Sequence, residues 1–70
     1  MTVNELISVC SPEENFQIMN YSKQNDDFGE KVYFSGNIWT FVANDFLLKK
    51  YGERTVRALT MGLFSLIVAV

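Results

Sequence analysis

Apolar side chains recur at alternate positions in two neighbouring segments, Phe16-Gln17-Ile18-Met19-Asn20-Tyr21 and Lys31-Val32-Tyr33-Phe34-Ser35. A period of two is typical of β-strands, because successive side chains point to opposite faces of a sheet. The polar segment Lys23 to Gly29 between them is typical of a turn, so the sequence predicts an antiparallel hairpin. We expect Phe16 and Ile18 to share one face. In the second strand we expect Val32 and Phe34 to face inward and Lys31, Tyr33 and Ser35 to face outward.

The residues before this hairpin predict a helix. Thr2-Val3-Asn4-Glu5 has the pattern of a capping box, in which Thr2 and Glu5 satisfy each other's backbone amides. The apolar residues that follow have the spacing of an amphipathic helix: Val3, Leu6, Ile7 and Cys10. Pro12 disfavours a helical conformation at Ser11. We therefore expect a helix from Val3 to Cys10 that lays its apolar face on the sheet.

A second helix is predicted from Asp45 to Tyr51. Asn44 is a favourable N-cap, Asp45 suits the first turn, and Gly52 stands at a plausible C′ position. The preceding segment, Ile38 to Ala43, has two interpretations, a short strand or a packed linker.

Two further strands are predicted at Thr55 to Thr60 and Leu63 to Val70, joined across Met61-Gly62. The last has apolar residues on both faces, which indicates a central strand covered on both sides or one buried at an interface. The expected order is α-β-β-α-β-β. The sequence thus predicts a single α+β domain over residues 1–70, with helices packed on a mostly antiparallel four-stranded sheet.

The composition restricts the chemistry. The 70 residues include one cysteine and no histidine, so no disulfide forms within the chain and no zinc site of Cys and His ligands is expected. We expect no cofactor, no metal and no enzymatic activity, since histidine is the commonest acid–base catalyst. The free thiol of Cys10 favours a reducing compartment, so we expect the cytoplasm.

No membrane segment is expected. Ala58 to Val70 is uncharged but spans only 13 residues, whereas a membrane-spanning helix needs about 20. A buried strand pair therefore explains this stretch better than a tail anchor. The polar N-terminus does not predict a secretory signal.

The carboxylate pairs and the cysteine that could act in catalysis are each better explained by a structural role. The pairs Glu13-Glu14 and Asp26-Asp27 lie in expected loops, with no apolar enclosure to raise a pKa. Cys10 lies on the apolar stripe of the first helix and has no histidine partner, which favours a core residue over a nucleophile.

Charge is unevenly distributed. Residues 1–30 hold six carboxylates against one lysine, a net charge of −5, whereas residues 31–70 hold five basic side chains against two carboxylates, a net charge of +3. Five carboxylates form a candidate partner-binding surface: Glu13, Glu14, Asp26, Asp27 and Glu30. The basic part contains a weak candidate nucleic-acid contact, made of Lys49, Lys50, Tyr51, Arg54 and Arg57, in which Tyr51 could stack on a base. The pI near 4.8 argues against nucleic-acid binding.

Trp39, with Phe41 and Tyr33 near it in sequence, has two interpretations. The three rings either form an exposed aromatic patch that marks a partner or a dimer contact, or fill the core. Tyr33 and Trp39 are therefore candidate partner-binding residues.

Three segments carry a resemblance to a known group: Met1-Thr2-Val3-Asn4-Glu5-Leu6-Ile7, Tyr33-Phe34-Ser35-Gly36 and Leu66-Ile67-Val68-Ala69-Val70. Together they resemble small uncharacterised proteins of phages and prophages of Gram-positive bacteria. The chain differs from them in its longer acidic loop and in the segment from Ile38 to Arg57. The resemblance implies a protein that acts by binding, and such proteins include CRISPR–Cas inhibitors whose carboxylates occupy nucleic-acid surfaces. It implies no functional residues.

These observations predict a non-enzymatic protein-binding module. The resemblance extends this to a phage or prophage accessory protein in the host cytoplasm, such as an inhibitor of a host defence complex. Two alternatives stay open, namely a self-assembling protein that dimerises through the C-terminal strand and a weak nucleic-acid binder.

Overall fold

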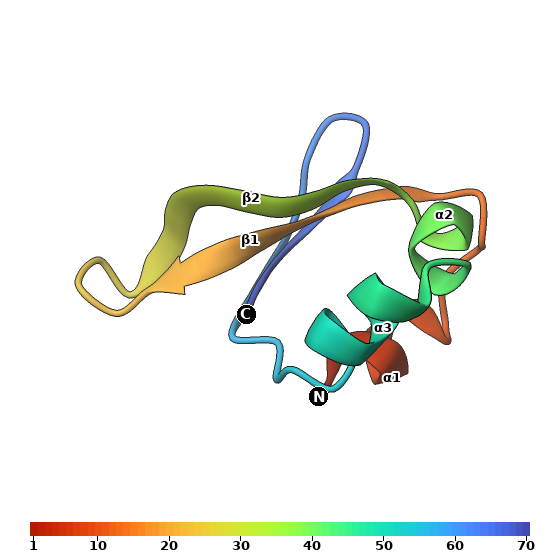
Figure 1. The fold of residues 1–70 in the computed structure, drawn as a ribbon. Helices are drawn as coiled ribbons and strands as arrows, with labels where there is room; N and C mark the ends of the chain where they lie inside the picture. Colours follow the sequence, from red (N-terminus) through yellow and green to blue (C-terminus); the bar gives the residue numbers. More distant parts are fainter.

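A computed structural model describes residues 1–70 and contains three short helices and four strands (Figure 1). In chain order they are α1 (Val3–Ile7), β1 (Asn15–Ser22), β2 (Asp27–Asn37), α2 (Ile38–Val42), α3 (Asp45–Tyr51), β3 (Ala58–Met61) and β4 (Leu66–Ala69). The chain is a single α+β unit, as predicted, with one helix more than the predicted order.

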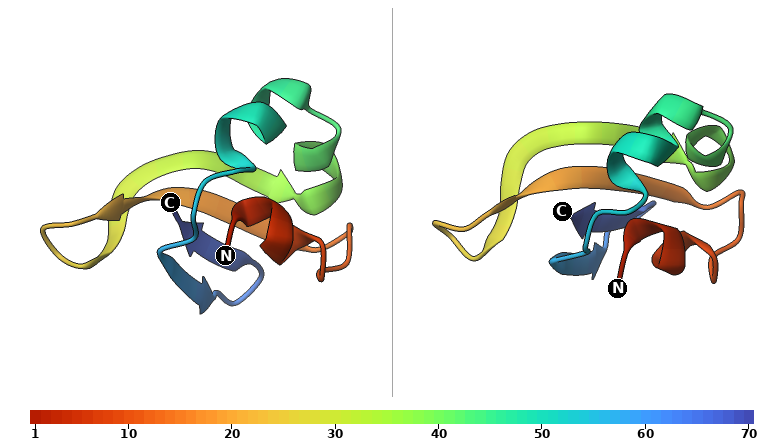
Figure 2. Two further views of the ribbon diagram at one scale, coloured as in Figure 1. Left: turned by 90° about the horizontal axis from the view of Figure 1, so that it is seen from below. Right: turned by 60° about the horizontal axis from the view of Figure 1, so that its bottom comes forward.

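The strands form one mixed sheet in the order β2-β1-β4-β3. The β1–β2 and β3–β4 pairs are antiparallel, whereas β1 and β4 pair in parallel at the centre. All three helices lie against one face of this sheet (Figures 1 and 2). β4 is a central strand, as its apolar residues indicated, but the helices cover only one of its faces. Ala58 to Val70 forms a strand pair, but β3 is largely exposed, so the pair is not buried as predicted. No helix of the structure is long and apolar enough to cross a membrane.

The core lies between the sheet and the helices. Phe16 and Ile18 of β1 pair with Leu66 and Val68 of β4, so the four side chains share the face towards the helices, and all four are buried. The helices complete the core with Val3, Leu6, Ile7, Ile38, Phe41 and Tyr51. Phe16 contacts Phe41 edge-on, with ring centroids 5.3 Å apart, a geometry favoured by aromatic quadrupoles.

The β1–β2 hairpin is confirmed, but its second strand is longer than predicted and departs from strict alternation. Ile18 pairs with Phe34 and the next residue, Met19, pairs with Val32, so Tyr33 is the extra residue of a bulge. As a result Val32 is 52% exposed, whereas Tyr33 stacks on Tyr51 with centroids 5.2 Å apart. The prediction was therefore right for Phe34 and wrong for Val32 and Tyr33.

The helix predicted from Val3 to Cys10 ends at Ile7. Its capping box is present as expected, but the amides of Val9 and Cys10 donate to carbonyls three residues back, at 3.3 and 3.2 Å. The chain thus leaves the helix in tighter turns before Pro12. Cys10 lies outside the helix but still packs, half-buried, against the core.

Ile38 to Ala43 is neither a strand nor a linker, because Ile38–Val42 forms α2. The side chain of Asn37 accepts a hydrogen bond from the Thr40 amide at 2.8 Å and begins the helix. Ile38 and Phe41, three residues apart, are thereby buried together. Burial outweighs the strand preference of these residues.

The second predicted helix, Asp45–Tyr51, is confirmed as α3. The Asn44 side chain accepts from the amides of Phe46 and Leu47, at 3.1 and 3.2 Å. Gly52 ends the helix at the C-cap, with φ of −59°, and not in the left-handed conformation of a C′ glycine. A Cβ at Gly52 would clash with the Leu48 carbonyl oxygen in the preceding turn of α3 and with the end of the Asn4 side chain of α1. Because the carbonyl belongs to the backbone, the last turn of α3 leaves no room for a side chain here.

The last two strands are shorter than predicted. β3 begins at Ala58 and not Thr55, because Arg54 to Val56 instead bond the N-terminal residues Met1 and Val3. The turn is centred on Leu63 and Phe64 and not on Met61-Gly62, since the Gly62 amide donates to the Ser65 carbonyl at 2.7 Å.

The capping box predicts a pH-dependent contribution to stability. The hydrogen bonds from the Thr2 backbone amide and hydroxyl lower the pKa of the Glu5 carboxyl. A carboxylate with a lowered pKa stabilises the fold above its unfolded pKa, about 4.3, and loses this effect as the pH falls through the folded pKa. Urea titrations should show Glu5→Gln less stable than the wild type at neutral pH, with the difference decreasing as the pH falls below about 4.3. A constant difference across this range would contradict the assignment. Thr2→Ala is the control and should cost about 1 kcal/mol at neutral pH.

Gly52→Ala should destabilise the protein by about 1 to 3 kcal/mol, because the new methyl group meets a backbone carbonyl that cannot rotate away. Chemical denaturation measures this. Gly36→Ala is the matched control, since its Cβ would meet only the end of the Phe34 ring, at 3.1 Å. If both variants lose the same free energy, the Leu48 carbonyl is not what excludes a side chain at Gly52.

Candidate protein-binding groove

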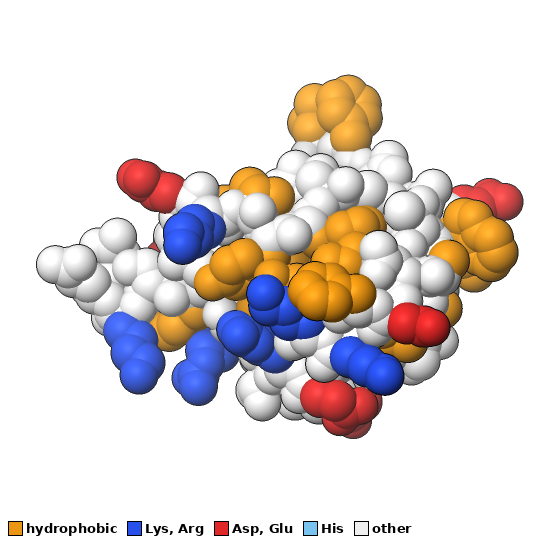
Figure 3. Space-filling view, viewed as in Figure 1, with side chains coloured by type: hydrophobic (Ala, Val, Ile, Leu, Met, Phe, Trp, Pro, Cys, Tyr) orange, Lys and Arg blue, Asp and Glu red, His pale blue; other side chains and the backbone are white.

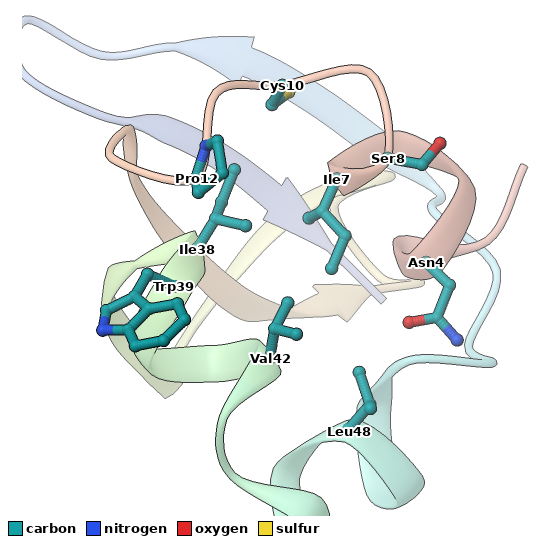
Figure 4. A pocket seen from close by; sticks show the side chains of 9 residues that line it. All are labelled: Asn4, Ile7, Ser8, Cys10, Pro12, Ile38, Trp39, Val42 and Leu48. Atoms are coloured by element: carbon teal, nitrogen blue, oxygen red, sulfur yellow. The ribbon is translucent and has the colours of Figure 1, made fainter.

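An apolar groove opens between the three helices, with a volume of about 380 Å³ (Figure 4). Ile7, Val42 and Leu48 line it from α1, α2 and α3 respectively. The other lining residues are Asn4, Ser8, Cys10, Pro12, Ile38 and Trp39. Its size is at the lower end of the range for small-molecule sites and suits one or two large apolar side chains.

Two backbone hydrogen bonds join α2 to the loop before β1 at one side of the groove. The Ile38 amide donates to the Glu14 carbonyl and the Trp39 amide donates to the Pro12 carbonyl, both at 2.9 Å. Pro12 is thus held beside Trp39 at the rim. The floor is rigid, because Ile7 and Ile38 belong to the core.

Trp39 is exposed, which settles the choice that the sequence left open. Its side chain is 65% exposed, whereas Phe41 is fully buried and Tyr33 stacks on Tyr51. The expected patch of three rings therefore does not form. Trp39 instead lies at the groove with Val42, which is 44% exposed. Once residues 38 to 42 are recognised as a helix, this i, i+3 spacing identifies the pair.

Cys10 is the one thiol of the groove. Its Sγ lies 3.5 Å from the Leu6 carbonyl oxygen, as a weak donor. Partial burial, together with the Glu14 carboxylate, raises the pKa of the thiol above its usual value. Cys10 is therefore a packing residue in its protonated form, which agrees with the sequence interpretation.

The five candidate carboxylates do not form one surface. Glu13 and Glu14 precede β1, whereas Asp26, Asp27 and Glu30 lie at or near the hairpin loop beyond its other end. Eight strand residues separate the two groups by about 25 Å. Glu14 adjoins the groove through the bond from the Ile38 amide to its carbonyl, and Glu13 and Glu14 also line a second hollow with residues 61–65 of the β3–β4 turn.

Two carboxylates of the hairpin have a local structural role. Asp26 has a positive φ of 51° and accepts a hydrogen bond from the Tyr21 hydroxyl, which raises the pKa of that phenol. Asp27 accepts from the Phe28 amide at 2.8 Å. These contacts shape the loop, so the carboxylates of Asp26 and Asp27 have a structural role as well as a charge.

The basic residues cluster around buried and half-buried tyrosines. Lys50 and Arg54 lie over the Tyr51 ring, at 5.6 and 5.7 Å, and Arg57 lies over Tyr21 at 5.8 Å. Positive side chains gather on the face seen in Figure 3. Tyr51 is only 7% exposed, however, so it is not available to stack on a base as the sequence suggested. Lys49 is exposed at the end of α3.

Comparisons with protein-family models, curated proteins and solved structures find no match to this chain. The groove and its rim are therefore the features of this chain that bear on its function.

Alkylation of Cys10 should reveal the raised pKa of its thiol. With iodoacetamide, the pH of half-maximal rate in the folded protein should exceed that in urea, where it is about 8.5. Glu14→Gln should lower this midpoint but leave it above the unfolded value, because burial is the larger cause. A folded midpoint at or below the unfolded value would mean that Cys10 is an activated thiol.

Proposed function

We propose that this chain is a non-enzymatic protein-binding module whose contact surface is the groove between α1, α2 and α3. The observation that carries the proposal is the exposed Trp39 at the rim of an apolar groove. Tryptophan is enriched among residues that dominate binding energy, and such residues lie beside apolar pockets that exclude water. A 65% exposed indole on a rigid helix has this arrangement.

The lining favours an apolar anchor from the partner. Asn4 and Ser8 are the polar side chains at the groove, and no side chain that is charged at neutral pH lines it. The groove thus lacks the charged pair that would orient a polar ligand. A leucine, methionine or phenylalanine of a partner protein would bury its side chain against Ile7, Ile38 and Val42.

The charges near the groove favour basic residues next to that anchor. Glu13 and Glu14 lie in the loop whose backbone bonds α2, and Asp45 begins α3. These exposed carboxylates attract a partner of positive charge and repel an acidic one. We therefore propose a partner segment with one large apolar residue flanked by lysine or arginine.

We also propose that the protein acts in a phage or prophage setting, since three of its sequence segments resemble small phage and prophage proteins of Gram-positive bacteria. In that setting the partner is a host protein, such as a component of a defence complex, and the site of action is the host cytoplasm. Because the carboxylates are divided between two ends of β1, the groove supports this role better than an extended acidic surface does.

Capture from a nuclease-treated lysate of a Gram-positive host, read by mass spectrometry, tests this function. Wild-type bait should retain one stoichiometric protein, and Trp39→Ala should weaken its binding about 30-fold or more, as expected for a hot-spot residue. Phe46→Ala is the matched control, since Phe46 is 69% exposed but does not line the groove. Reversal of Asp26, Asp27 and Glu30 to lysine should leave binding unchanged.

Circular dichroism establishes that each variant is folded before the binding comparison. Equal retention by wild type and Trp39→Ala would rule out the groove. Loss only on reversal of the three hairpin carboxylates would move the contact surface to the acidic loop.

A further inference from the structure

The two edges of the sheet differ in how they are protected. The outer strand β2 carries Glu30 and Lys31 and has two register shifts against β1, features that discourage further strand pairing. The other outer strand, β3, has the sequence Ala-Leu-Thr-Met, with no charge, no proline and a regular register with β4. It is an unprotected edge in a domain whose opposite edge is protected.

The pairing pattern identifies which backbone amides and carbonyls of β3 have no partner within the sheet. The Gly62 amide bonds the Ser65 carbonyl, and inward bonding alternates along an antiparallel pair, so Thr60 and Ala58 face β4. The amides and carbonyls of Leu59 and Met61 therefore point away from the sheet. They provide two donors and two acceptors at the edge.

Apolar side chains gather at the same place. Leu59 and Met61 pair with Val68 and Leu66, so they lie on the core face of the sheet, yet they are 50% and 72% exposed. Beyond the strand, Leu63 is 90% exposed and Phe64 83% exposed. The β3–β4 turn projects from the body of the molecule, with apolar side chains at its tip (Figures 1 and 3).

We propose that this edge binds a second copy of the same chain through antiparallel pairing of β3 with β3. A two-fold axis at Thr60 places Thr60 opposite the partner's Thr60 and Leu59 opposite the partner's Met61. In this register the open groups of Leu59 and Met61 bond each other across the axis. The two four-stranded sheets then form one continuous sheet, and the four Leu59 and Met61 side chains extend both cores along one face.

The self-complementarity of β3 identifies the occupant. A second copy supplies all the partners that this register requires, because residue 59 of each copy lies opposite residue 61 of the other across the two-fold axis. Threonine pairs opposite each other are also favourable in antiparallel strands. No charged residue lies between Ala58 and Val70, so no charged side chain of β3 meets its own copy across the axis. The carboxylates beside the β3–β4 turn, Glu13 and Glu14, belong to the loop before β1. Since β2 is protected, the assembly closes at two copies and does not continue as a fibre.

The area agrees with a weak but specific dimer. A fully exposed side chain of this size presents roughly 150 Å². At their exposures, Leu59 and Met61, which pair directly across the axis, offer roughly 180 Å² per copy. Leu63 and Phe64, on the turn beyond the strand, raise the upper limit to roughly 450 Å² per copy, or roughly 900 Å² for two. The paired backbones add to this, which brings the total towards the roughly 1,200 Å² at which specific interfaces begin.

The proposed interface uses a different strand from the dimer that the sequence suggested. That expectation used the C-terminal strand, Leu63 to Val70, but β4 is already paired on both sides, by β1 and β3. A charge at Leu66 or Val68 would disrupt the core and not a dimer contact. The inference is independent of the groove between the helices, which lies on other elements.

Sedimentation of the full chain from about 10 µM to about 1 mM tests the dimer. The wild type should move from the mass of one chain to that of two, without larger species. Leu59→Lys should remain a monomer over the whole range, and so should Met61→Lys. Val32→Lys is the matched control, because Val32 is 52% exposed on the opposite edge and should leave association unchanged.

Amide hydrogen exchange gives a second measurement that does not depend on a variant. The amides of Leu59 and Met61 should exchange about tenfold more slowly at the highest concentration than at the lowest, whereas the Thr60 amide, bonded within the chain, should not change. A wild type that stays monomeric to 1 mM, or a dimer with unchanged Leu59 and Met61 amides, would overturn the proposal. Equal loss of the dimer in Val32→Lys would place the interface at β2.

Discussion

The parallel pairing of β1 with β4 is the interaction on which the rest of the fold depends. Each strand also belongs to a local antiparallel hairpin, and this pairing alone joins the two hairpins into one sheet. Its register sets Phe16 beside Leu66 and Ile18 beside Val68, which makes one continuous apolar face. The helices cover that face because their own buried residues have no other apolar surface to pack against. The pairing joins residues 50 positions apart, so its formation carries a loop-closure cost that the packing of the helices helps to offset.

Local patterns predicted the parts of the fold that local interactions determine. The Thr2–Glu5 capping box, the Asn44 cap with α3, and the β1–β2 hairpin are each specified within about 20 residues of sequence. The bulge at Tyr33 could not be found in this way. It turns Tyr33 towards Tyr51, a partner in a helix much later in the chain that the alternation of β2 does not reveal. Local periodicity does not predict the parallel pairing of β1 with β4 either, because the two strands are far apart in the sequence.

The candidate groove was missed for a related reason. Ile38 to Val42 reads as a strand by residue preference, and in a strand Trp39 and Phe41 would lie on one face. In a helix they separate, so that Phe41 enters the core and Trp39 remains at the surface. Trp39 was among the residues selected from the sequence, but its partners, Pro12 and Val42, were not. Their contribution depends on the backbone bonds that hold the loop before β1 against α2.

The small size of the core explains why two apolar surfaces remain open. Twelve of the 70 residues are buried, whereas ten large apolar side chains are exposed, so packing within one copy leaves much of the apolar surface in water. A domain of this length has little stability to spare, and its one cysteine cannot form the internal disulfide that often compensates. Exposed apolar groups at the groove and at β3 contribute nothing to that stability until they are covered. Association with other chains at these two places would stabilise the fold by the same burial that forms its core.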